Sequence, residues 1–169
     1  MRFSTLLAAA GLTLGLAAAP AAATTWQLTS IIDGLQETPP VATPGNGSAT
    51  LTYDDVANLL SWTISFSDLI GTTTDAHFHG PAPVGTPAGV RVAIPHTDGL
   101  TSGVFAGSAT ITDAFETELL AGLWYINIHT SFRPGGEIRG QVTVVPEPGT
   151  LALAALGLLG LALRRRGPR

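Results

Sequence analysis

The segment Leu60-Ser61-Trp62-Thr63-Ile64-Ser65-Phe66-Ser67 is the clearest structural signal in this chain. Every even position is a large apolar residue, and every odd position is Ser or Thr. Alternate side chains of an extended strand point to opposite faces. The pattern therefore predicts an antiparallel strand that buries its apolar face and turns its hydroxyl groups outward.

Further short segments have the composition and spacing of strands. We expect strands in residues 26–32, 49–53, 76–79, 89–94, 104–112, 123–129 and 137–144. Residues 35–41 contain two prolines, which indicates an edge strand or a loop. Residues 80–87 contain three prolines, which indicates a loop. Many short strands with turn signals at roughly ten-residue spacing predict an all-β antiparallel sandwich or barrel.

One helical signal interrupts the strands. Asp113 is a candidate N-cap, Glu116 stands three residues later, and Gly122 follows two leucines as a stop signal. We therefore expect one short helix, of two turns, within residues 114–121.

The two ends of the chain are typical of targeting segments. Residues 1–23 have a charged start, an apolar stretch and small residues before Ala23, which predicts a signal peptide cleaved after that residue. At the other end, Pro146-Glu147-Pro148 precedes the uncharged run 151–163 and then Arg164-Arg165-Arg166. A thirteen-residue helix is about 20 Å long, which is marginal for a bilayer core of about 30 Å. The expected domain between the two ends is 24–145, and 146–169 forms the tail.

The charge of the central domain excludes one class of partner. Within 24–145, eleven acidic residues stand against Arg91, Arg133 and Arg139, a net charge of −8 with neutral histidines. Nucleic-acid binding requires a basic surface, so we expect no nucleic-acid partner. The chain has no cysteine, so the exported domain depends on its apolar core rather than on disulfides.

Histidines provide the candidate site. In Ala76-His77-Phe78-His79-Gly80, alternation places both histidines on the face opposite Phe78, and His129 ends a strand of the same kind. Imidazole groups in this arrangement suit copper or zinc, with His96 as a possible fourth ligand from a loop. If 123–129 and 137–144 pair, an outer polar patch also contains three supporting residues, Glu137, Asn127 and Arg139. The alternative is a hydrogen-bonded network without metal.

Four motifs give the central domain a family resemblance. They are Leu35-Gln36-Glu37-Thr38-Pro39-Pro40-Val41, Ala76-His77-Phe78-His79-Gly80-Pro81, residues 122–130 and residues 134–141. The chain resembles the CHRD (chordin-type) domain over about residues 26–144. The resemblance implies an immunoglobulin-like β-sandwich, distantly similar to copper/zinc superoxide dismutase, without a settled activity. The similarity to that enzyme implies that His77, His79 and His129 would be copper ligands. It also implies that Arg139 would attract an anion. The absence of a cysteine and of a histidine-rich zinc loop argues against dismutation.

The tail resembles the PEP-CTERM sorting signal of Gram-negative bacteria, through Pro146, Glu147 and Pro148, the apolar run and the arginine cluster. That resemblance implies an exosortase-type processing enzyme, transient contact with the inner membrane, and a place at the cell surface or in the exopolysaccharide matrix. The leading hypothesis is therefore a non-enzymatic surface or matrix protein that binds exopolysaccharide or surface proteins. The alternative is a copper- or zinc-binding domain that uses the histidines, with redox activity as a further hypothesis.

Overall fold

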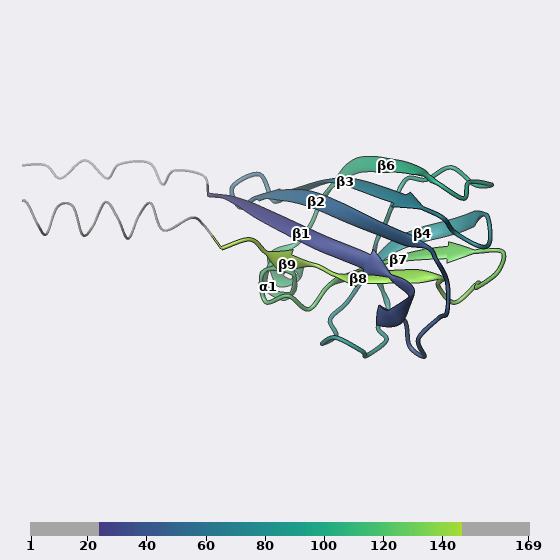
Figure 1. Ribbon diagram of the computed structural model, residues 1–169. Helices are drawn as coiled ribbons and strands as arrows, with labels where there is room; N and C mark the ends of the chain where they lie inside the picture. The colour runs from purple at the N-terminus through teal and green to yellow at the C-terminus, as the bar shows by residue number, and fades with distance from the viewer. Residues whose placement is uncertain (1–23, 147–169) are drawn as a thin grey trace, which may run out of the picture.

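The computed structural model describes residues 24–146 (Figure 1). The expected signal peptide, 1–23, and the tail from Glu147 onward, with its apolar run and arginine cluster, lie outside the described residues. Among residues 24–146, no helix is long and apolar enough to cross a membrane.

The regular structure of the described part is almost entirely β-strand, which confirms the all-β prediction. A 3₁₀ helix, η1 (Gly34–Gln36), and one α-helix, α1 (Asp113–Leu120), accompany the strands. The strands are β1 (Thr25–Asp33), β2 (Asn46–Asp54), β3 (Leu59–Ser67), β4 (Thr73–His79), β5 (Val90–Ala93), β6 (Gly103–Thr110), β7 (Tyr125–Thr130), β8 (Ile138–Gln141) and β9 (Thr143–Val144).

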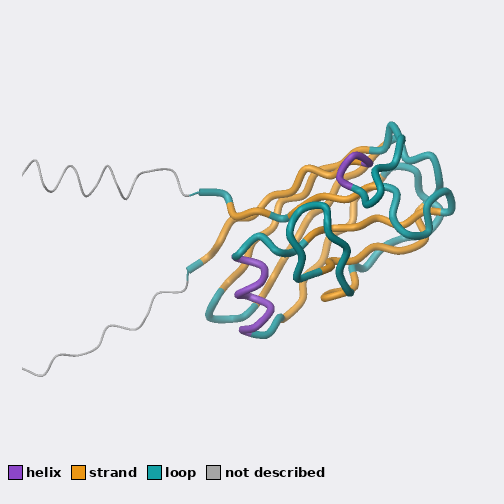
Figure 2. The backbone as a smooth tube through the Cα atoms, turned by 90° about the horizontal axis from the view of Figure 1, so that it is seen from below, coloured by secondary structure: helices purple, strands orange, loops and turns teal. Residues whose placement is uncertain are grey.

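The strands form one antiparallel path in the order β5-β4-β7-β8-β1-β2-β3-β6, with β9 beside β1. β2 pairs with both β1 and β3 along nine residues. β1 and β8, in contrast, pair at Asp33 and Arg139 alone. In Figure 1 the layer β1-β2-β3-β6 lies over the layer β4-β7-β8, so the path folds into a β-sandwich. Figure 2 shows both ends of the described chain entering the sandwich on one side.

The core lies between these layers. Leu60, Trp62, Ile64 and Phe66 of β3 are at most 4% exposed, as their alternation predicted. The Trp62 ring packs edge-on against Phe78 of β4, with ring centroids 5.0 Å apart. This contact joins the layers, and truncating an aromatic residue at such a position typically costs about 3–5 kcal/mol.

One local expectation requires correction. Thr112, not Asp113, caps α1, because the Thr112 hydroxyl accepts a hydrogen bond from the Phe115 N–H and Asp113 is already in the first turn. Gly122 follows the helix with φ +71°, as the stop signal predicted. Leu35 and Gln36 belong to η1 and residues 37–41 form a loop, so the segment 35–41 takes no part in the sheet, in agreement with the loop alternative.

Candidate metal centre

β4 and β7 place the three strand histidines on one face of the sheet. The pairing sets Asp75 opposite His129, and His79 opposite Tyr125. Residues Phe78 and Ile126, which alternate with these polar residues, are fully buried in the core. The core therefore fixes the direction in which the histidine side chains point.

The three imidazole rings converge. One nitrogen from each of His77, His79 and His129 lies within 4.8 Å of the other two. The ring centroids are 5.3, 5.5 and 5.9 Å apart. A metal bonded to three imidazoles at about 2.0–2.1 Å places the ring centroids about 5.2 Å apart with tetrahedral angles and about 5.5 Å apart with planar trigonal angles. The observed triangle is thus close to the size that one metal ion requires.

The other nitrogen of each ring is held by an oxygen acceptor. His77 Nε2 lies 3.1 Å from Asp75 Oδ1. His79 Nδ1 lies 2.9 Å from the Ala88 carbonyl, and His129 Nδ1 lies 2.9 Å from the Pro134 carbonyl. If each of these nitrogens carries the proton, the remaining nitrogen presents a lone pair to the centre of the cluster.

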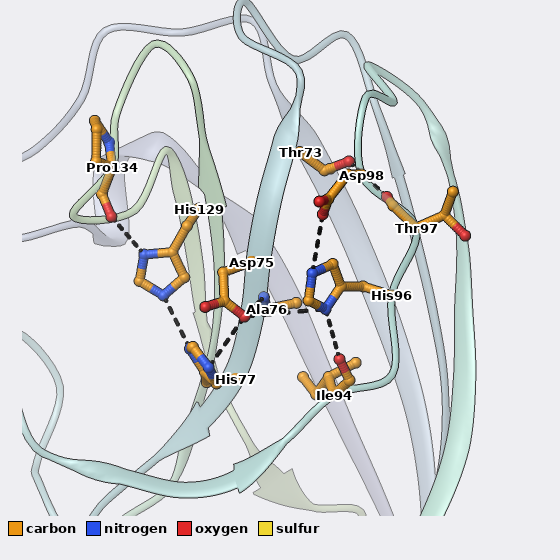
Figure 3. Close-up of polar contacts among 10 residues, drawn as sticks. All are labelled: Thr73, Asp75, Ala76, His77, Ile94, His96, Thr97, Asp98, His129 and Pro134. Atoms are coloured by element: carbon orange, nitrogen blue, oxygen red, sulfur yellow. Dashed lines mark hydrogen bonds and ion pairs between the residues drawn. The ribbon is translucent and has the colours of Figure 1, made fainter.

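Two observations indicate that the central nitrogens lack a protein donor. His79 Nε2 is buried without a hydrogen-bond partner. His77 Nδ1 and His129 Nε2 face each other at 3.3 Å (Figure 3), although in these tautomers both would be lone pairs. Such a pair requires a shared proton or a cation. On a tetrahedral metal with bonds of about 2.0–2.1 Å, neighbouring nitrogens are about 3.3–3.4 Å apart.

The environment disfavours an additional proton on the cluster. Burial lowers the pKa of His77 below its usual value, and the His129 and His96 rings lower it further, while Asp75 acts in the opposite direction. Burial also lowers the pKa of His79, against the effect of its hydrogen bond to Ala88. Both rings are therefore favoured in their neutral form, which is the form that binds metals.

The structure does not bring His96 into this group. Its Nδ1 lies 2.9 Å from the Ile94 carbonyl, and its Nε2 lies 3.1 Å from Asp98 Oδ1. It approaches the cluster only through Asp75, whose Oδ1 is 3.9 Å from His96 Nδ1 (Figure 3). The expected fourth ligand thus has both ring nitrogens directed at oxygen atoms of its own loop.

Glu137 does not support the histidines either. It is fully buried, and its carboxylate accepts hydrogen bonds from the Thr43 and Thr130 hydroxyls and from the backbone N–H groups of Ile70 and Gly71. Burial acts to raise the pKa of Glu137, but these hydrogen bonds outweigh it, and the pKa lies below its usual value. Glu137 instead joins the loops that surround β7 and β8.

Asn127 and Arg139 face each other across β7 and β8, as expected, but they are not on an open surface. Asn127 is 5% exposed and Arg139 is 2% exposed. Arg139 donates to the Thr38 hydroxyl and to the Thr86 carbonyl, so loops cover the face that was expected to be outermost. Because its guanidinium is buried, Arg139 is not in direct contact with solvent.

Alternation along β4 and β7 also places two further residues beside the histidines. Asp75 shares the face of His77 and His79, and Tyr125 shares the face of His129. The Tyr125 ring stacks on His79, with centroids 5.0 Å apart and planes 5° apart. The two carbonyls that hold His79 and His129 come from loops, and no residue pattern indicates them.

The fold and the site together define a small β-sandwich domain that gathers three imidazoles on one covered sheet face. The family model of the CHRD domain matches residues 28–142, and the chain belongs to this family. The PEP-CTERM protein-sorting motif matches residues 144–166, which marks an exported protein handled by an exosortase-type sorting system, with a surface or membrane-associated location. No curated protein and no solved structure matches the chain. The narrower likeness to immunoglobulin or superoxide dismutase sandwiches stays a prediction.

Proposed function

We propose that this exported CHRD-domain protein binds one copper or zinc ion through His77 Nδ1, His79 Nε2 and His129 Nε2. One observation carries the proposal: each ring has one nitrogen beside an oxygen acceptor, and one nitrogen from each ring lies within 4.8 Å of the other two. Metal-binding histidines in proteins usually donate their second N–H to a carboxylate or carbonyl in this way. His79 Nε2 is buried without a hydrogen-bond partner, which supports a nitrogen kept for an ion.

The donor set favours copper and zinc over harder cations. Three neutral imidazoles suit these two ions, whereas magnesium and calcium prefer oxygen ligands. No fourth His, Asp or Glu among the described residues joins the group. A bound ion would therefore keep a coordination position for a small ligand, and it would supply Lewis-acid chemistry or, as copper, redox chemistry.

The location and the wider role complete the proposal. The sorting signal supports release at the cell surface or into the exopolysaccharide matrix after contact with the inner membrane. A metal-binding module of this kind needs no enzymatic activity, so the proposal is compatible with the non-enzymatic role expected from the sequence. Superoxide dismutation is not proposed, because Arg139 is buried and the chain has no cysteine.

Metal analysis of the full chain, purified in detergent, tests the proposal. After incubation with copper or zinc and removal of excess metal, we expect one ion per chain in the wild type and none in a His77→Ala/His79→Ala variant. His96→Ala is the matched control and should retain the ion. A metal-free wild type would contradict the proposal, and so would a variant lacking both histidines that keeps a full equivalent.

A further inference from the structure

Tyr125 lies between a candidate ligand and a buried cation. One face of its ring stacks on His79, at a centroid distance of 5.0 Å. The guanidinium carbon of Arg139 lies over the Tyr125 ring, 3.4 Å from its centroid. Offset stacking and cation–π contacts of this kind are favourable, and more so away from water. His79, Tyr125 and Arg139 are 9%, 2% and 2% exposed, so little water reaches the stack.

The Tyr125 hydroxyl and His79 both hydrogen-bond the backbone of Ala88. The hydroxyl accepts a hydrogen bond of 2.9 Å from the Ala88 N–H. The carbonyl of the same residue is the partner of His79 Nδ1, at 2.9 Å. Tyr125 therefore acts on His79 in two ways. Its ring stacks on the His79 ring, and its hydroxyl holds Ala88, whose carbonyl sets which nitrogen of His79 carries the proton.

Arg139 holds the loop that contains Ala88. Its two terminal nitrogens donate to the Thr38 hydroxyl and the Thr86 carbonyl. Thr86 is two residues before Ala88, so the guanidinium both backs the Tyr125 ring and anchors the loop that supplies the acceptor for His79. A lysine can make only part of this arrangement, because it lacks the planar group.

We propose that Tyr125, backed by Arg139, is the positioning residue of the candidate metal centre: it fixes the His79 ring so that Nε2 points at the ion. The inference rests on the proposed metal site and assigns a role to a residue that does not touch the metal. Loss of a group that orients a ligand typically lowers metal affinity by about 10–100-fold. The role predicts a defect in His79 coordination rather than a general loss of fold.

Two variants of the full chain test this role. Tyr125→Phe keeps the stacked ring but leaves the Ala88 N–H without its acceptor, and Arg139→Lys keeps the charge but removes the planar contact. We expect each to weaken Cu²⁺ binding by about 10–100-fold in competition with a chelator. We also expect each to change the nitrogen hyperfine pattern in the electron paramagnetic resonance spectrum of the copper-loaded protein.

Arg91→Lys is the control for a general loss of stability. Arg91 also lies over an aromatic ring, that of Phe115, and pairs with Glu118 at 2.8 Å. This control should keep the wild-type affinity and spectrum. An equal loss of affinity in the control would overturn the proposal, and so would wild-type affinity and spectrum in both test variants.

A readout on the metal-free protein separates this proposal from the metal site itself. In ¹⁵N nuclear magnetic resonance spectra, the wild-type His79 should show one tautomer, with the proton on Nδ1, and Tyr125→Phe should show a mixture. If the wild type binds no metal, the proposed function fails while the tautomer still reports on positioning. An unchanged single tautomer in Tyr125→Phe would overturn the positioning role even in a protein that binds copper.

Discussion

Asp75 Oδ1 lies 3.1 Å from His77 Nε2, on the side of the ring opposite the nitrogen that faces His129. A carboxylate in this position favours the tautomer in which Nδ1 is free to bind a metal, and it increases the basicity of that nitrogen. Asp75 is thus the only one of the three acceptors around the cluster that comes from a side chain. It can therefore be tested by substitution.

Asp75→Asn should lower the affinity of the cluster for copper or zinc by about 10–100-fold, because the amide holds the His77 proton less firmly. Chelator competition measures the effect. Asp98→Asn is the control: within residues 24–146 the ion-pair partner of Asp98 is His96, and its side chain is 74% exposed. Equal affinities for Asp75→Asn and the wild type would show that this carboxylate does not support the site.

Glu137→Gln should destabilise the domain by about 2–4 kcal/mol at pH 7, because an amide cannot accept all four hydrogen bonds that the buried carboxylate accepts. The pKa of Glu137 is lowered from 4.5 on folding. Its contribution is therefore complete above pH 4.5 and is lost as the pH falls through the folded-state value. Urea denaturation of both proteins at pH 7 and pH 4 should give a smaller difference at pH 4. The same difference at both values would contradict the assignment.

Glu37 should have the opposite dependence on pH. Burial raises its pKa from 4.5 to about 7, although Arg139 acts in the other direction. The free energy of unfolding should therefore fall by about 3 kcal/mol from this group as the pH rises from 4.5 to 7. Glu37→Gln removes that fall and should be the more stable protein at pH 8. Parallel stability curves for the two proteins between pH 5 and pH 8 would rule this out.

Gly136 tests the packing around Glu37 and Asn127. Its φ is +124°, and an added Cβ would overlap side-chain atoms of both residues. Gly136→Ala should therefore cost more than about 2 kcal/mol of stability. The neighbouring Gly135 has no heavy atom within 4 Å of the Cβ position, so Gly135→Ala should be nearly neutral. Thermal unfolding of both variants measures the difference, and similar melting temperatures would contradict the described packing.

The sequence predicted the faces of the strands because alternation depends only on the local backbone. It correctly oriented Trp62 and Phe78 toward the core and His77 and His129 away from it. It also predicted the pairing of Asn127 with Arg139, because a short loop between consecutive strands sets the register.

Strand alternation does not predict contacts between segments that are distant in the sequence. Strand alternation predicts that Glu137 lies beside His129. Its hydrogen-bond partners include Thr43 and Ile70, which are 94 and 67 residues away in the chain. No local pattern indicates that loops cover Arg139 and Tyr125, because loop conformation depends on the surface on which the loop packs. His96 lies outside the cluster for the same reason: its own loop supplies the oxygens that face its ring.

X-ray absorption spectroscopy of the protein loaded with one equivalent of zinc or copper is the most direct test of the central claim. The account predicts three imidazole nitrogens at about 2.0–2.1 Å from the ion. It also predicts that this imidazole signal disappears when His77, His79 and His129 are all replaced by alanine. An ion surrounded only by oxygen, or an unchanged imidazole signal in the triple variant, would contradict the account.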